Sequence, residues 1–218
     1  AEPYNTLILD KKAFKNPIPD VRGLAPKDNM KAWVDRKSHI HNFGHAAAAY
    51  AGFLAEPHAI YLADVLKNKA VKKFVRSAML QSAEVLMRIY PGEFSPADLT
   101  EHVDDLLFRF SNRALGDTVF RVGCDLKRKL HRNDRILSPL IDGMEIKSPV
   151  NRILQTFAYG LCFQARDENG NLLPGDVEFT RILYKKGLAY VLSHICGLHP
   201  VNDHRVIQRI LATARKVS

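Results

Sequence analysis

A short stretch near the N-terminus concentrates side chains that can move protons. Lys37, Asn42 and His45 lie within nine residues of one another, directly before an alanine-rich run. On a helix that turns about 100° per residue, Asn42 and His45 lie roughly 140° and 80° from Lys37, so the three share one broad side. An amine, an imidazole and a carboxamide on one side suit the interconversion of an alcohol and a carbonyl, which needs a proton acceptor and donors to the oxygen. We expect Lys37 to be buried beside Arg36, because burial and a neighbouring cation both favour loss of its proton.

The same stretch admits two other interpretations. His41 and His45 are four residues apart with His39 nearby, and this spacing on a helix is compatible with a zinc site. The stretch lacks the glutamate of the zinc-protease pattern, however. These polar residues can also be ordinary solvated or hydrogen-bonded side chains of a basic helical protein. The spacing alone leaves all three interpretations open.

Helices are the elements that must position these side chains. Apolar residues at helical intervals predict helices over 28–55, 57–66, 70–90, 96–110, 149–166, 177–196 and 202–218. Asp28 is expected to cap the first of them, Ser95 with Pro96 the fourth and Ser148 the fifth. No sustained alternation of apolar and polar residues predicts a strand. The predicted fold class is therefore all-α, a single multi-helical domain of seven to nine helices.

Two stretches differ from this helical pattern. Residues 1–28 hold four prolines and few periodic apolar positions, which predicts an extended lead-in that packs on the helical domain of residues 29–218. Residues 111–140 break into short pieces crowded with charged residues and asparagine, and we expect a functional loop there. The chain opens on Ala1 without an initiator methionine, so we also expect it to belong to a longer polypeptide.

The composition limits the class of partner. Of the 218 residues, 46% are hydrophobic and 25% charged, which excludes a wholly disordered chain. The longest uncharged apolar run, residues 46–55, is about half as long as a membrane-spanning helix. A net charge of +9 favours an anionic partner such as nucleic acid, an anionic membrane or a phosphorylated substrate. The three cysteines are more than 30 residues apart, which supports neither a disulfide framework nor a cysteine-based zinc site, and we expect a cytoplasmic protein.

A basic helical module that binds nucleic acid is the alternative from a different class. It would use a run of cations near position 70, namely Lys67, Lys69, Lys72, Lys73 and Arg76. Such a module predicts that affinity for DNA falls steeply with salt. A solvated helix face explains the same run, and we expect neither nucleic acid nor a membrane as partner.

Two motifs make the sequence similar to a known family. Lys37, Asn42 and His45, in a K-x4-N-x2-H spacing, resemble the signature of the polyol-specific long-chain dehydrogenases, the mannitol dehydrogenase family. A second stretch resembles the mannitol-1-phosphate 5-dehydrogenase branch of that family. It comprises 109–112 (RFSN), 115–118 (LGDT), 121–123 (RVG), Asp125, 128–130 (RKL), Asp134 and Arg135.

The resemblance implies a role for each matching residue. Lys37 would be the general acid and base, and Asn42 and His45 would bind and polarise the reacting oxygen. Arg121 and Lys129 would contact substrate oxygens, with Arg128 beside them. A guanidinium and an ammonium can hold hydroxyls or a phosphate through charge-assisted hydrogen bonds.

The other explanation for these cations is structural, because solvent or ion pairs with Asp117 and Asp125 can also satisfy Arg121 and Lys129. The reaction implied by the resemblance is oxidation of mannitol 1-phosphate to fructose 6-phosphate with NAD, without a metal. Cys124 and Leu126 stand where that branch is expected to carry arginine and proline. The alternative within the family is therefore a mannitol 2-dehydrogenase or a hexuronate reductase acting on fructuronate or tagaturonate.

The resemblance also implies a second domain. The sequence contains no G-x-G-x-x-G turn of the kind that binds a dinucleotide, so NAD is expected to be bound mainly by an N-terminal Rossmann domain, in cis or in trans. We expect the chain alone to fold without turning over, because hydride transfer requires a nicotinamide fixed against the substrate carbon. The expected partners are a polyol or sugar phosphate and that domain, and the expected oligomeric state is a monomer.

Overall fold

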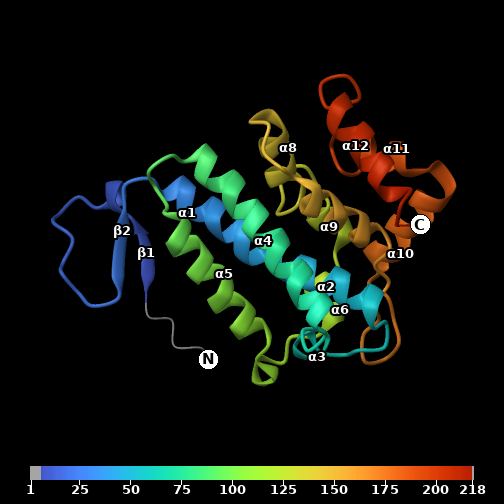
Figure 1. Cartoon of the computed structure of the whole chain (residues 1–218), viewed down its shortest axis with the longest axis horizontal. Helices are drawn as coiled ribbons and strands as arrows, with labels where there is room; N and C mark the ends of the chain where they lie inside the picture. The colour runs from blue at the N-terminus through green and yellow to red at the C-terminus, as the bar shows by residue number, and fades with distance from the viewer. Residues whose placement is uncertain (1–5, 218) are drawn as a thin grey trace.

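The computed structural model describes residues 6–217, and helices dominate it (Figure 1). The α-helices are α1 (Met30–Arg36), α2 (Phe43–Ala55), α3 (Leu62–Val65), α4 (Lys69–Ile89), α5 (Pro96–Phe110), α6 (Val119–Gly123), α7 (Leu126–Lys129), α8 (Leu137–Glu145), α9 (Asn151–Leu161), α10 (Pro174–Lys186), α11 (Leu188–His194) and α12 (His204–Ala214). Two 3-10 helices, η1 (Lys11–Ala13) and η3 (Arg113–Leu115), and one π-helix, η2 (Lys37–Asn42), complete the helical elements.

The all-α class is confirmed. The described residues contain more helices than the expected seven to nine for two reasons. Segment 111–140 forms short helices of three to five residues, η3, α6 and α7, and also the start of α8. Gly187, at a φ of +80°, separates α10 from α11, where the sequence predicts one helix.

Two short strands lie in the expected proline-rich lead-in. β1 (Leu7–Asp10) and β2 (Leu24–Lys27) form a parallel pair in which Leu7 is opposite Leu24. Four residues are too few to give a visible alternation of apolar and polar positions, so the sequence pattern does not reveal them. The strands lie at the opposite end of the molecule from α10, α11 and α12 (Figure 1). Residues 1–5 of the expected lead-in lie outside the described residues.

The core forms around the alanine-rich helix α2. Residues 46–49 of α2 are alanines that are fully buried, and such small side chains let α4 and α9 approach closely. At Gly44 the approach leaves no room for a side chain, because an added Cβ would lie 2.6 Å from the sulfur of Met79 on α4. Tyr50, also buried, donates a hydrogen bond of 3.2 Å to the carbonyl of Gly123 at the end of α6. Helix α2 therefore joins the first predicted motif to the second.

The helix caps agree with the sequence in one place and differ in two. Ser95 caps α5 by accepting from the amide of Asp98 at 3.1 Å. The cap of α1 is Asn29, one residue after the expected Asp28. Ser148 is buried and its hydroxyl makes no hydrogen bond. Gln81 of α4 takes its place, because its side-chain oxygen accepts from two amides at the start of α9.

Candidate active site

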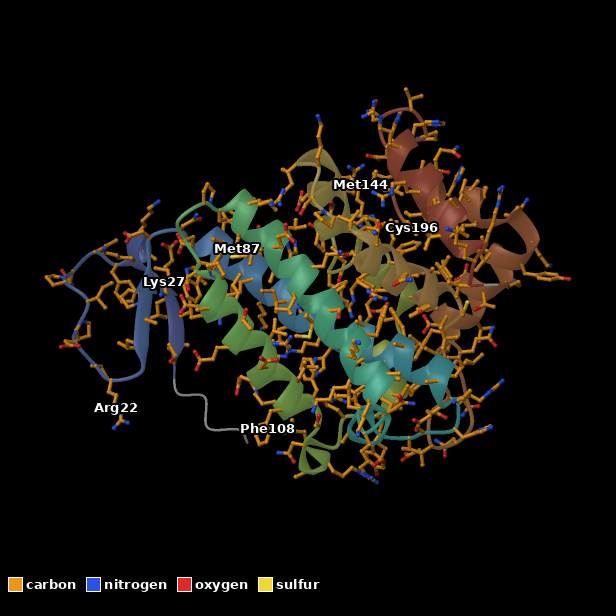
Figure 2. The ribbon with its side chains drawn as sticks, viewed as in Figure 1. Arg22, Lys27, Met87, Phe108, Met144 and Cys196 are labelled. Atoms are coloured by element: carbon orange, nitrogen blue, oxygen red, sulfur yellow. The ribbon has the colours of Figure 1, made fainter. Side chains whose placement is uncertain are left out.

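An open groove of about 1130 Å³ lies between the strand pair, α1, η2 and α5. Lys27 on β2 and Phe108 on α5 line it, and both are labelled in Figure 2. The groove is rich in cations and imidazoles, with Lys37, Arg36, His41, His102 and Arg109 among its lining residues. Leu7, Val34 and Phe108 expose large apolar surfaces at the same groove. This groove is the candidate substrate cavity.

Lys37 and Asn42 of the first motif lie on the π-helical turn η2 between α1 and α2, and His45 follows on α2. The amide of Phe43 donates to the carbonyl of Ser38, five residues earlier, as in a π-helix. Ser82 of α4 donates a 2.6 Å hydrogen bond to the carbonyl of His39, inside the turn, and so ties the turn to α4. Residues five apart lie on successive turns of a π-helix, so Asn42 follows Lys37 along one side. The 140° separation expected for an α-helix does not apply.

Lys37 lines the groove and is exposed, contrary to the expected burial. The groove reaches the π turn at Lys37 and His41, and the strand pair, α1 and α5 supply most of its other lining residues. Asn42 is half-buried, and neither Asn42 nor His45 is among the groove's lining residues. His41 links the two parts of the motif, since it lines the groove and its ring lies 5.0 Å from that of His45.

His45 has a well-defined environment. Its ring stacks on Phe110 with 3.9 Å between centroids, and its Nε2 lies 3.4 Å from a carboxylate oxygen of Asp117 without forming a hydrogen bond. Burial lowers the pKa of His45 to about 4, and cations near it act in the same direction: Arg121, Arg135, Lys129 and Arg109. His45 is therefore neutral at pH 7. Cations of the second motif thus lower the pKa of a residue of the first motif.

Arg121, one of the cations near His45, lies on α6. Thr118 caps this helix by accepting from the amide of Arg121 at 3.1 Å. The Arg121 guanidinium forms an ion pair with Asp117, and its side chain remains largely exposed. The sequence left open that Arg121 forms an ion pair with Asp117 and has only a structural role, and the structure contains that pair.

Lys129 lies on α7 and is almost completely buried. Its ammonium donates to the backbone carbonyls of Val122, at 2.7 Å, and Cys124. Burial lowers its pKa to about 8. Asp176, which the sequence analysis did not single out, caps α7 from α10 by accepting from the amides of Asp125 at 2.9 Å and Leu126 at 2.7 Å.

Arg128, the third expected substrate ligand, is exposed and paired with acids of its own segment, Asp125 and Asp134. Arg135 belongs to the second motif, although the resemblance assigns it no contact with the substrate. The structure brings it near His45, where its charge lowers the imidazole's pKa. Its guanidinium donates to Asp134 at 2.7 Å. Arg135 could have been found from its place in the motif, whereas Asp176 carries no local signal.

The geometry gives little support to the two other interpretations, a zinc site and a nucleic-acid-binding module. Within residues 6–217 no three or more His, Cys, Asp or Glu side chains form a group that could hold a metal ion. In the basic run, Lys67 is paired with Asp64, and Arg76 makes two hydrogen bonds to Asp104. None of the helices in the described part of the chain is long and apolar enough to cross a membrane.

Comparison with known proteins decides the family. The model of the mannitol dehydrogenase C-terminal domain matches residues 29–207. The chain belongs to this family. Two solved structures share the fold of this mannitol dehydrogenase domain. Mannitol 2-dehydrogenase from Pseudomonas fluorescens, in a ternary complex with NAD and D-mannitol, has a TM-score of 0.71 at 21% identity. A substrate-free D-sorbitol dehydrogenase has a TM-score of 0.66 at 18% identity.

The mannitol dehydrogenase domain described here spans less than half of each relative. The alignments cover 96% and 89% of this chain but only 43% and 40% of the mannitol 2-dehydrogenase and sorbitol dehydrogenase chains. The described residues do not fit a dinucleotide by themselves. β1 runs into η1, and β2 reaches α1 through Asp28 and Asn29, so neither junction has the glycine-rich turn that cradles a pyrophosphate.

Proposed function

We propose that this chain is the substrate-binding and catalytic domain of an NAD-dependent polyol dehydrogenase. The observation that supports it most is the π turn Lys37–Asn42, which places the amine of Lys37 at an open groove and Asn42 on the following turn. The neutral imidazole of His45, which follows on α2, completes the set that the family signature predicts. Lys37 takes the proton of the reacting hydroxyl, and Asn42 and His45 hold that oxygen.

Hydride transfer needs a nicotinamide cofactor, for which the described strand–helix junctions offer no glycine-rich turn. NAD, held by another domain, would accept the hydride from the substrate carbon. That domain would cover the groove, where the exposed Leu7, Val34 and Phe108 offer an apolar surface for it.

The proposed substrate is mannitol 1-phosphate, which gives fructose 6-phosphate by oxidation at C5. The cations that surround His45 support an anionic substrate. In this proposal Arg121 anchors the hydroxyls together with Lys129, which would use the ammonium hydrogen that is not donated to Val122 or Cys124. The phosphate lies toward Arg128. A neutral polyol is the second candidate, because Arg121 and Arg128 are already paired with acids.

Replacement of Lys37 tests the proposed base. In the complete enzyme, in which this chain is joined to its cofactor-binding domain, Lys37→Ala should lower kcat by about 10²- to 10⁴-fold. Lys37→Arg should be as inactive, because a guanidinium does not release its proton at neutral pH. The control Lys72→Ala removes an exposed lysine from α4 and should keep the wild-type kcat. A loss of only a few fold in Lys37→Ala, with unchanged circular dichroism, would move the base to another residue.

Substrate profiling tests the finer assignment. A phosphate bound by charged hydrogen bonds should raise kcat/KM for mannitol 1-phosphate about 10- to 100-fold above that for mannitol. Steady-state kinetics with both compounds, and with fructuronate and tagaturonate in the reductive direction, separate the members of the family. Higher kcat/KM for free mannitol would favour the neutral-polyol candidate.

A further inference from the structure

The carboxylate of Asp117 joins two residues that the proposed function assigns to the substrate. One oxygen lies 3.4 Å from Nε2 of His45, and the other is paired with the guanidinium of Arg121. His45 contacts the reacting oxygen in the proposed mechanism, and Arg121 holds a hydroxyl. Asp117 therefore lies where neighbouring substrate oxygens would bind.

Backbone hydrogen bonds hold Asp117 in this position. The amide of Leu62 donates to the carbonyl of Asp117 at 2.9 Å, and the amide of Val119 donates to that of Ile60 at 2.8 Å. Tyr61 and Thr118 form an isolated antiparallel bridge between these bonds. The Asp117 side chain is only 12% exposed, whereas that of Arg121 is 63% exposed. The carboxylate is thus held in place, whereas the guanidinium paired with it is open to solvent.

The pair distinguishes hydroxyls from anions by its hydrogen-bonding capacity. Arg121 can only donate hydrogen bonds, and an ionised Asp117 can only accept them. A hydroxyl does both, so it can accept from Arg121 and donate to Asp117 together. A phosphate or carboxylate in the same place would accept from Arg121 but would bring its charge against that of Asp117.

We infer that Asp117 is a specificity-determining residue, which accepts a hydrogen bond from the substrate hydroxyl next to the reacting carbon and keeps anionic groups away from Arg121. This inference rests on the proposed function for its substrate. It fixes the orientation in which a sugar phosphate binds, because the phosphate must lie away from Arg121.

Kinetics in the complete enzyme test the hydroxyl contact. The two substrates are the preferred polyol and its analogue that lacks the hydroxyl next to the oxidised carbon. Asp117→Asn should reduce the preference for the polyol, measured as the ratio of kcat/KM values, at least about tenfold. Asp117→Glu, which keeps the carboxylate, should restore part of the preference. Asp104→Asn is the matched control, because it changes an Asp–Arg pair between α4 and α5 and should keep the wild-type ratio.

Phosphate binding to the 218-residue chain tests the exclusion of anions without any turnover. Inorganic phosphate is titrated while the NMR signal of the Arg121 guanidinium is followed. Asp117→Asn should bind phosphate at least about fivefold more tightly than the wild type, whereas Asp117→Glu and Asp104→Asn should match the wild type.

The outcomes separate the inference from the proposed function. An unchanged substrate ratio, or an unchanged phosphate affinity in a folded Asp117→Asn variant, overturns the role of Asp117 while polyol oxidation stands. If the wild-type enzyme oxidises no polyol or sugar phosphate, the proposed function fails, and with it the hydroxyl contact. The phosphate titration still decides whether Asp117 excludes anions from Arg121.

Discussion

Lys129 depends on a carboxylate from a different helix for its position. The Asp176 carboxylate on α10 accepts hydrogen bonds from the amides of Asp125 and Leu126. It so fixes the first turn of α7, which carries Lys129. Asp125 has a φ of +74°, a left-handed conformation that aspartate tolerates better than most residues. The carboxylate of Asp176 therefore supports a turn that the local sequence does not stabilise by itself.

Replacement of Asp176 should loosen this segment. Asp176→Asn keeps the size of the side chain but sets an amide NH₂ against one of the two backbone donors. We expect the free energy of unfolding, measured by urea denaturation, to fall by about 1–3 kcal/mol. Glu178→Gln, on the same helix but in an exposed pair with Lys127, should leave the unfolding midpoint unchanged. Equal midpoints for both variants would show that Asp176 does not hold α7.

Sequence reasoning at this scale found the residues whose partners are local. Lys37, Asn42 and His45 form one motif on a continuous stretch of helix, and their spacing is visible in the sequence. Asp117 and Asp176 act through contacts with distant segments, on α2 and α7 respectively. A single sequence contains no signal for such a contact, so their roles emerge only from the fold.

At the scale of elements, the π turn is held by the contact between α2 and α4. Gly44 lies two residues after Asn42 and one before His45, and it packs against Met79. Because no side chain fits there, the rotation of α2 that orients His45 depends on this glycine.

The substitution Gly44→Ala should separate the two helices. Its Cβ would lie 2.6 Å from the sulfur of Met79, and overpacking of this kind costs about 1–3 kcal/mol of stability. Gly175→Ala on α10 is the control, since its Cβ would meet nothing within 4 Å, and replacing a helical glycine stabilises by about 0.4–1 kcal/mol. Thermal or urea unfolding of both variants measures the difference. A Gly44→Ala variant as stable as the wild type would mean that Met79 yields without cost.

The sequence predicted the long helices and missed the short or broken ones for physical reasons. Helices α4 and α5 follow a strong apolar period and end close to the expected residues. The π turn has the same helix-forming composition as its flanks, and its extra residue is set by packing against α4. The short helices α6 and α7 are fixed by Thr118 and Asp176, not by their own propensity.

At the scale of the whole molecule, buried histidines link stability to pH. Burial lowers the pKa of His39 and of His45 to about 4. The unfolded chain binds these protons near pH 6.5, before the folded chain does, so the free energy of unfolding decreases as the pH falls from 6.5 to 4. Burial, with Glu145 and Asp35 nearby, raises the pKa of Asp142 to about 6, which acts in the opposite direction.

Urea unfolding between pH 7 and 4.5 should reveal this balance. The wild type should lose stability on acidification, with about 3 kcal/mol at most from each histidine. His39→Gln should show a shallower loss, because the substitution removes one of the three histidines whose pKa burial lowers, namely His39, His45 and His102. The control His58→Gln replaces an exposed side chain and should keep the wild-type slope. Identical slopes for all three proteins would contradict a contribution from His39.

The short bridge between Tyr61 and Thr118 limits the relative motion of the two segments that it joins. It fastens the chain just after α2, which carries His45, to the start of α6, which carries Arg121. These two parts cannot move apart without breaking backbone pairing. In the proposed function, His45 and Arg121 would therefore keep their spacing while a substrate enters and leaves.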